Sequence, residues 1–245
     1  MPLFLSFEGG EGSGKSTQAK KLYQRLIGQG YTALLVREPG TTPLGNYLRD
    51  WLKSQKRQED AISPVAEMFL FEAARAELVA KVIRPYLSAT PHGIVITDRY
   101  MDSTAAYQGY GRRIDLEKVT AANDLAVQGV VPDLTFLLDI PPEEGLNRVR
   151  AKVGLEEAGT GQVGRMDAEG TRRFEEESLA FHRRVRQGYL KLVKQSPERW
   201  RVVDAARSVH DIAEEIWTLL EKHLANLSIQ HNDEQAGLFS RLKPN

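Results

Sequence analysis

Residues 3–17 read LFLSFEGGEGSGKST, a mostly apolar run followed by a glycine-rich turn and a Lys-Ser-Thr triplet. The pattern G-x-x-x-x-G-K-S fills residues 9–16, with a strand pattern before it and an amphipathic helix pattern after it. Glycines allow successive N–H groups to face one concavity, and the positive end of the following helix adds to the attraction for phosphate. We expect a nucleoside triphosphate with Mg²⁺ here, held by Gly9, Gly10, Glu11, Gly12, Ser13, Gly14, Lys15, Ser16 and Thr17.

The remainder of the chain alternates short apolar runs with longer amphipathic stretches. The apolar runs predict strands over 3–7, 32–36, 93–97, 134–138 and 200–203. The amphipathic stretches predict helices over 16–27, 65–86, 116–127, 141–152, 174–194 and 209–224, the second interrupted by Pro85. This alternation favours an α/β fold of the P-loop NTPase type, a five-stranded parallel sheet with helices on both faces.

Two segments depart from this pattern. Residues 153–170 are rich in glycine and have little apolar periodicity, so we expect a mobile lid there. Residues 228–245 are polar and aperiodic, and we expect a flexible C-terminal tail. The rest, residues 1–227, shows no shift in composition and reads as a single domain that contains the phosphate-binding loop.

Composition narrows the possible classes of protein. The 245 residues carry 33 basic and 33 acidic side chains, a balance that argues against a nucleic-acid partner. The chain has no cysteine, which excludes a disulfide scaffold and a thiolate nucleophile. The N-terminus meets glycine and charge by residue 8 and does not resemble a signal peptide, and no run is long enough for a membrane span. We therefore expect a cytoplasmic protein without a membrane partner.

Charged residues follow two of the predicted strands. Asp98 and Arg99 end the run at 94–97, and Arg37 ends the run at 34–36. Ligands of parallel sheets bind at the carboxyl ends of strands, so Asp98 is placed to hold Mg²⁺ with Ser16, and the two arginines to grip a second phosphate. A second anion beside the nucleotide suggests phosphoryl transfer rather than hydrolysis.

The segments FEGGEGSGKST, REPGTTPLG, FLFEAARAE, DRYMDSTAAYQG and RFEEESLAFHRRVRQGY occur in this order over residues 3–220, and together they resemble the thymidylate kinases. The resemblance implies transfer of a phosphoryl group from ATP to dTMP, giving dTDP and ADP for dTTP biosynthesis, with Mg²⁺ as cofactor and a homodimer as the assembly. A kinase for another nucleoside monophosphate and a non-catalytic nucleotide-binding protein are the alternatives. The aromatic Phe71 and the blocking Tyr107 argue against the former, and Lys15 with Asp98 against the latter.

The resemblance also implies individual roles. It places Glu11 near the sugar 3′-hydroxyl, Arg37 and Arg99 on the acceptor phosphate, and Tyr107 against the 2′ position. It places Phe71, Arg75, Thr104 and Gln108 around the thymine base, and Arg148, Ala205 and Ala206 around adenine. Residues 10–13 contain no basic side chain, so an arginine of the lid must neutralise the transferred group. The candidates are Arg165 and Arg173, which join Lys15 and Arg99 as expected catalytic residues.

Two local features carry further expectations. Phe69 and Phe71 lie two apart on a predicted helix, so one should be core and the other can face a cleft. Thr41 stands where related chains read a second glycine in EPGGT, and a positive φ there would strain its backbone.

Overall fold

The computed structural model describes residues 1–54, 62–157, 174 and 177–241. A five-stranded sheet has the order β2-β3-β1-β4-β5, and every pairing is parallel. The strands are β1 (Leu3–Glu8), β2 (Ala33–Arg37), β3 (Ile94–Asp98), β4 (Leu134–Asp139) and β5 (Trp200–Asp204). The predicted sheet is confirmed, and each strand ends one residue later than expected, on a charged residue that follows the apolar run.

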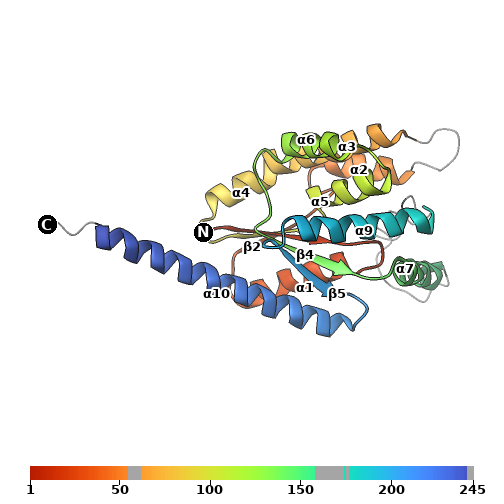
Figure 1. Ribbon diagram of the computed structural model, residues 1–245. Helices are drawn as coiled ribbons and strands as arrows, with labels where there is room; N and C mark the ends of the chain where they lie inside the picture. The colour runs from red at the N-terminus through yellow and green to blue at the C-terminus, as the bar shows by residue number, and fades with distance from the viewer. Residues whose placement is uncertain (55–61, 158–173, 175–176, 242–245) are drawn as a thin grey trace.

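Helices cover both faces of the sheet (Figure 1). Alternate residues of β1 point to opposite sides: Leu5 and Phe7 pack in one core with α1 (Lys15–Gly28) and α10 (Val209–Arg241), and Phe4 packs in another with Val95 and Tyr100. The second face carries α3 (Pro64–Leu78), α4 (Arg84–Ala89), α6 (Leu116–Val127) and α9 (Leu179–Gln195). The sheet is therefore buried on both sides, as its nearly continuous apolar strands require.

The remaining elements lie near the carboxyl ends of the strands. They are α2 (Pro43–Ser54), α5 (Met101–Thr104), the π-helix η2 (Ala105–Gly111) and α7 (Pro142–Glu157). Sequence periodicity predicted neither α2 nor the α5–η2 segment. The segment η2 has a π-helical repeat that a pattern based on 3.6 residues per turn does not detect.

The helix predicted over 65–86 differs in its detail. It forms three consecutive pieces, α3, the π-helix η1 (Val79–Ile83) and α4, and Pro85 lies in the first turn of α4. Proline is tolerated in a first helical turn because its missing N–H would have no partner there. The π turn therefore accommodates the proline, and the chain remains helical to Ala89.

Three other boundaries differ from prediction. Helix α7 runs to Glu157, so residues 153–157 are helical rather than part of a loop, and residues 158–170 of the predicted lid lie outside the described residues. Helix α9 begins only after Ser178, whose side chain caps it by accepting the Phe181 N–H. Helix α10 continues to Arg241, beyond the helix predicted over 209–224. No helix in the described part of the chain has the length and hydropathy to cross a membrane.

Candidate active site

The phosphate-binding loop joins β1 to α1. Gly12 has φ of 69°, and a Cβ built there would lie 2.0 Å from the Gly145 carbonyl oxygen, so only glycine fits this turn. Lys15 is buried, and its Nζ donates to the Gly10 carbonyl at 2.7 Å and to Ser13 Oγ at 3.3 Å. The ammonium group therefore lies folded against the loop that would receive the phosphates. Thr17, the last predicted residue of this group, is exposed in the first turn of α1.

The surroundings of Lys15 make its ammonium group more acidic than that of a free lysine. Burial, together with the neighbouring charge of Arg99, lowers the pKa of Lys15 to about 8, although Glu11 and Asp98 oppose the change. A bound polyphosphate would add negative charge beside Nζ and favour the protonated form.

Ser16 and Asp98 meet as predicted. The Ser16 hydroxyl donates to Asp98 Oδ2 across the gap between α1 and the end of β3. A hydroxyl and a carboxylate side by side are oxygen ligands of the kind Mg²⁺ takes when it also binds substrate phosphates. Among the described residues there is no cluster of three or more acidic or histidine side chains suited to a metal.

A cleft of about 750 Å³ opens beside the loop. Glu11 and Arg99 lie at its phosphate-loop end, and Phe71 and Gln108 contribute to its wall from α3 and η2. The full lining consists of Glu11, Glu38, Pro39, Arg49, Leu52, Phe71, Arg75, Arg99, Ser103, Thr104, Tyr107, Gln108 and Phe174. Seven of these are predicted substrate residues: Glu11, Phe71, Arg75, Arg99, Thr104, Tyr107 and Gln108.

Glu11 forms a tight polar cluster in the cleft. Its Oε1 accepts from Arg99 Nη2 and from the Tyr107 hydroxyl, each at 2.7 Å. Burial opposes ionisation of Glu11, but the charges of Arg99 and Lys15 and the Tyr107 hydrogen bond prevail and hold its pKa at about 2. Glu11 is therefore ionised at neutral pH and acts as a hydrogen-bond acceptor beside a cationic arginine.

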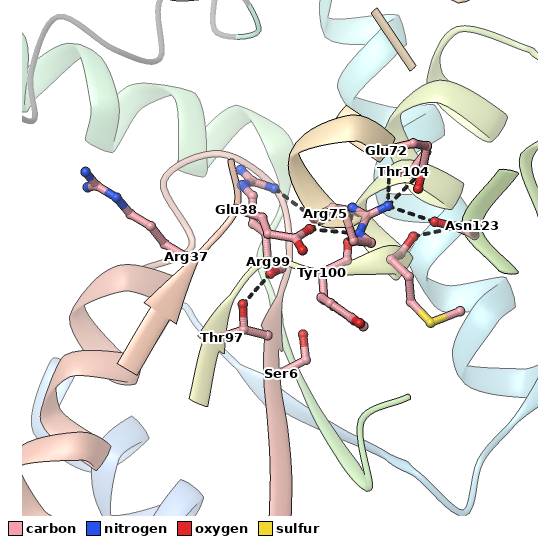
Figure 2. Close-up of polar contacts among 12 residues, drawn as sticks. Ser6, Arg37, Glu38, Glu72, Arg75, Thr97, Arg99, Tyr100, Thr104 and Asn123 are labelled. Atoms are coloured by element: carbon pink, nitrogen blue, oxygen red, sulfur yellow. Dashed lines mark hydrogen bonds and ion pairs between the residues drawn. The ribbon is translucent and has the colours of Figure 1, made fainter. Parts of the chain in front are cut away.

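Arg99 is held in an uncommon backbone conformation. Its φ is 72°, which a residue with a side chain rarely adopts. Two neighbours fix the turn: Thr97 Oγ1 donates to the Arg99 carbonyl at 2.7 Å (Figure 2), and the Tyr100 N–H donates to Glu8 Oε1 at 2.7 Å. Such strain at a strand end is typical of functional positions, and here it turns the guanidinium toward Glu11.

Arg75 lies at the centre of a buried network (Figure 2). Its Nε and Nη2 contact Glu38 Oε2, both at 2.8 Å, and Nη2 also donates to the Tyr100 carbonyl. Its Nη1 contacts Glu72, Thr104 and Asn123. A guanidinium has five N–H groups, so protein acceptors already engage all three of its nitrogens. Arg75 lines the cleft as predicted, but a contact to a base would require it to exchange a partner.

Glu38 is a part of the cleft that the sequence did not single out. It is 5% exposed, and among the described residues nothing pairs with its Oε1. Burial outweighs the charge of Arg75 and raises the pKa of Glu38 to about 7. Its place directly after Arg37 at the end of β2 was the available signal.

Arg37 lies apart from this network. Its side chain is exposed, extends away from Glu38 and Arg75 in Figure 2, and does not line the cleft. Thr41 has φ of 67°, a positive value of the kind that strains a residue with a side chain, and its Oγ1 accepts the Arg37 N–H at 3.0 Å. Arg49, from the unpredicted helix α2, supplies a guanidinium to the cleft instead, and it donates to the Pro39 carbonyl at 3.2 Å.

Three aromatic side chains line part of the cleft, namely Phe71, Tyr107 and Phe174. The ring centroids of Phe71 and Phe174 are 6.1 Å apart, and those of Phe174 and Tyr107 are 5.1 Å apart. Phe69 is 58% exposed and Phe71 lines the cleft, so the expectation that one of the pair is core is wrong. Helix α3 packs through other positions, such as Met68 and Leu78.

The predicted adenine residues come together. Arg148 Nη1 donates to the Ala205 carbonyl at 2.8 Å, and Nη2 to the Ala206 carbonyl at 3.2 Å and to Glu144 at 2.7 Å. Arg148 lies on α7 and the two alanines directly follow β5, so segments far apart in sequence form one surface. The predicted lid arginines, Arg165 and Arg173, lie outside the described residues.

The same arrangement of motifs marks a known family. The family model described as thymidylate kinase matches residues 7–216. The chain belongs to the thymidylate kinase family. The thymidylate kinase of Roseiflexus sp. (strain RS-1) is 46% identical over 228 residues, which cover 93% of this chain and 97% of that protein. The thymidylate kinase of Nitratidesulfovibrio vulgaris (strain DSM 19637 / Miyazaki F) is 47% identical over 214 residues, covering 87% of this chain and 94% of that protein.

A solved structure supports the same family. The crystal structure of thymidylate kinase from Ehrlichia chaffeensis superposes with a TM-score of 0.66 at 30% identity, covering 89% of this chain and 98% of that one. The thymidylate kinase motifs therefore occur here on the parallel P-loop sheet predicted from the sequence.

Proposed function

We propose that the protein transfers the γ-phosphoryl group of ATP to dTMP, giving dTDP and ADP. The observation that carries the proposal is the cleft, which begins at Glu11 of the phosphate-binding loop and ends among aromatic and hydrogen-bonding side chains. Membership of the thymidylate kinase family supports dTMP as the acceptor.

The acceptor phosphate needs little chemical activation. Its second pKa is near 6, so it is mostly a dianion at neutral pH and requires no general base. The difficulty is bringing two polyanions together, which cations and positioning must overcome. Lys15 binds the donor phosphates, and Arg99 binds the acceptor phosphate. Arg49, which shares the cleft, is a better-placed second cation than Arg37.

Membership of the thymidylate kinase family supports the remaining substrate contacts. The base lies against Phe71 beside Thr104 and Gln108, and Glu11 accepts from the 3′-hydroxyl. Arg148 and the loop at Ala205 take the adenine. Ser16 and Asp98 would hold Mg²⁺, which offsets phosphate charge when it is bound. Arg165 or Arg173 neutralises the charge of the transferred phosphoryl group. Residues 1–227 form the kinase domain.

The protein acts as a homodimer. Phe69 on α3 and Leu125 on α6 are 58% and 79% exposed, and the two helices lie next to each other in Figure 1. Large apolar side chains so exposed favour burial against a second copy. Phe69→Glu with Leu125→Glu should give a monomer in sedimentation velocity, whereas an unchanged sedimentation coefficient would contradict this interface.

A coupled assay of ADP release tests the reaction. With ATP and Mg²⁺, dTMP should give a kcat/KM at least tenfold above those of dCMP, dGMP and AMP. Lys15→Ala should lower kcat by at least a hundredfold while circular dichroism stays unchanged. Faster turnover of another monophosphate, or tight ATP binding without turnover, would overturn the proposal.

A further inference from the structure

A carboxylate that the proposed reaction does not use lies behind the base end of the cleft. Glu67, in the first turn of α3, is 0% exposed. Its Oε1 accepts from Gln108 Nε2 at 2.8 Å and from Arg112 Nε at 3.1 Å, and its Oε2 accepts from Arg112 Nη2 at 3.2 Å. The side chain does not line the cleft, whereas Gln108 does.

The pairing with Arg112 keeps Glu67 an acceptor. Two nitrogens of the Arg112 guanidinium face the two oxygens of Glu67, a fork geometry that favours the ionised carboxylate. Arg112 Nη1 donates in addition to Glu177 at 2.6 Å. An ionised carboxylate carries no proton and can only accept hydrogen bonds.

This property fixes the direction of the Gln108 amide. A glutamine amide has a donating nitrogen on one side and an accepting oxygen on the other. The Gln108 amide nitrogen donates to Glu67, so the amide oxygen must point in another direction. Among the described residues no donor reaches Gln108 Oε1. Gln108 is 2% exposed and borders the cleft, which is where a donor for that oxygen can come from.

We propose that Glu67 is a positioning residue that makes Gln108 present an acceptor to the nucleobase, so that the cleft selects a pyrimidine with an N–H at position 3. This inference rests on the proposed function, because it assumes that the base occupies the cleft. Thymine and uracil carry this N–H, whereas cytosine has a lone pair at the same position. A lone pair facing Gln108 Oε1 repels it and leaves a buried acceptor without a partner, which disfavours dCMP.

Glu67→Gln tests this orientation. The variant is isosteric, but a glutamine at position 67 can accept or donate, so the Gln108 amide is free to turn over. The ratio of kcat/KM for dTMP to that for dCMP should fall about tenfold or more, through a higher KM for dTMP and a lower KM for dCMP. A purely structural role would lower both activities together and leave the ratio unchanged.

Glu177→Gln is the matched control. It removes the other carboxylate partner of Arg112 but leaves the contact between Glu67 and Gln108, so the ratio should stay within twofold of that of the wild type. A fall in the ratio equal to that of Glu67→Gln would overturn the proposal, because it would trace the effect to Arg112.

A measurement on the wild-type protein does not depend on folding of a variant. N3-methyl-dTMP keeps the carbonyls at positions 2 and 4 but has no hydrogen to donate at position 3, and it should bind at least about tenfold more weakly than dTMP in calorimetry. Equal affinity would overturn the inference even if dTMP is the substrate. Absence of dTMP phosphorylation by the wild type would instead overturn the proposed function.

Discussion

Tyr107 and Arg99 share a single acceptor, since the Tyr107 hydroxyl and Arg99 Nη2 each lie 2.7 Å from Glu11 Oε1. The Arg99 guanidinium also lies over the Tyr107 ring, with Cζ 4.9 Å from the ring centroid. The three side chains come from the phosphate-binding loop, the end of β3 and η2. This cluster ties the donor loop to the wall of the acceptor cleft, and each member can be tested separately.

Arg99→Ala should weaken acceptor binding. Loss of a charged hydrogen-bond donor to phosphate should raise the KM for dTMP about 10- to 100-fold, with a change of less than threefold in the KM for ATP. Steady-state kinetics with each substrate varied in turn measures both. Arg25→Ala, which removes a partly exposed ion pair with Glu214, is the control and should leave both constants unchanged. A rise confined to the KM for ATP would show that Arg99 serves the donor.

Two substitutions separate the ring of Tyr107 from its hydroxyl. Tyr107→Ala opens space beside the sugar, so activity on the ribonucleotide UMP relative to dUMP should rise about tenfold. Tyr107→Phe keeps the ring and loses only the hydrogen bond to Glu11, so this preference should stay close to that of the wild type. Equal preferences in all three proteins would remove the role of the ring in sugar selection.

Lys15 should limit activity at alkaline pH. Its pKa of about 8 in the free protein means that Lys15 is charged below pH 8 and neutral above it. Because the neutral amine attracts phosphate less, kcat/KM for ATP should fall about tenfold per pH unit above this pKa. Lys15→Arg stays charged throughout and should show lower activity without this alkaline decline. A decline at the same pH in both proteins would assign it to another group.

Substitutions at Thr41 compare the cost of backbone strain with the gain from a hydrogen bond. Thr41→Ala keeps the positive φ but loses the acceptor for the Arg37 N–H. The free energy of unfolding should therefore fall by about 1 kcal/mol, which corresponds to a Tm lower by about 2–4 °C. Thr41→Gly loses the same bond but relieves about 1 kcal/mol of strain, and its Tm should stay near that of the wild type. Calorimetry compares the three, and a Tm lower for glycine than for alanine would contradict this account.

The sequence predicted the sheet well because strands buried on both faces are short apolar runs between glycines and charges. The phosphate-binding loop was predicted residue by residue, because its chemistry is local. Asp98 and Arg99 follow directly from the apolar run that precedes them, since the chain of a parallel strand can deliver them only to the carboxyl edge of the sheet.

What the sequence could not predict depends on tertiary contacts. Arg49 enters the cleft because α2 folds over it, and nothing near residue 49 indicates this. Phe69 has the apolar character of a core residue but lies on an outer face of α3. The partners of Arg75 include Glu38 and Asn123, which lie 37 and 48 positions from it in the sequence, so no local pattern could reveal these contacts.

The approach of Gly12 to Gly145 has a mechanical consequence. The loop that receives the triphosphate and the first turn of α7 touch backbone to backbone, without side chains that could yield between them. A shift of the loop toward α7 would therefore press directly on the backbone of the helix that carries Arg148. Substitution of either glycine by alanine would force the phosphate-binding loop and the first turn of α7 apart.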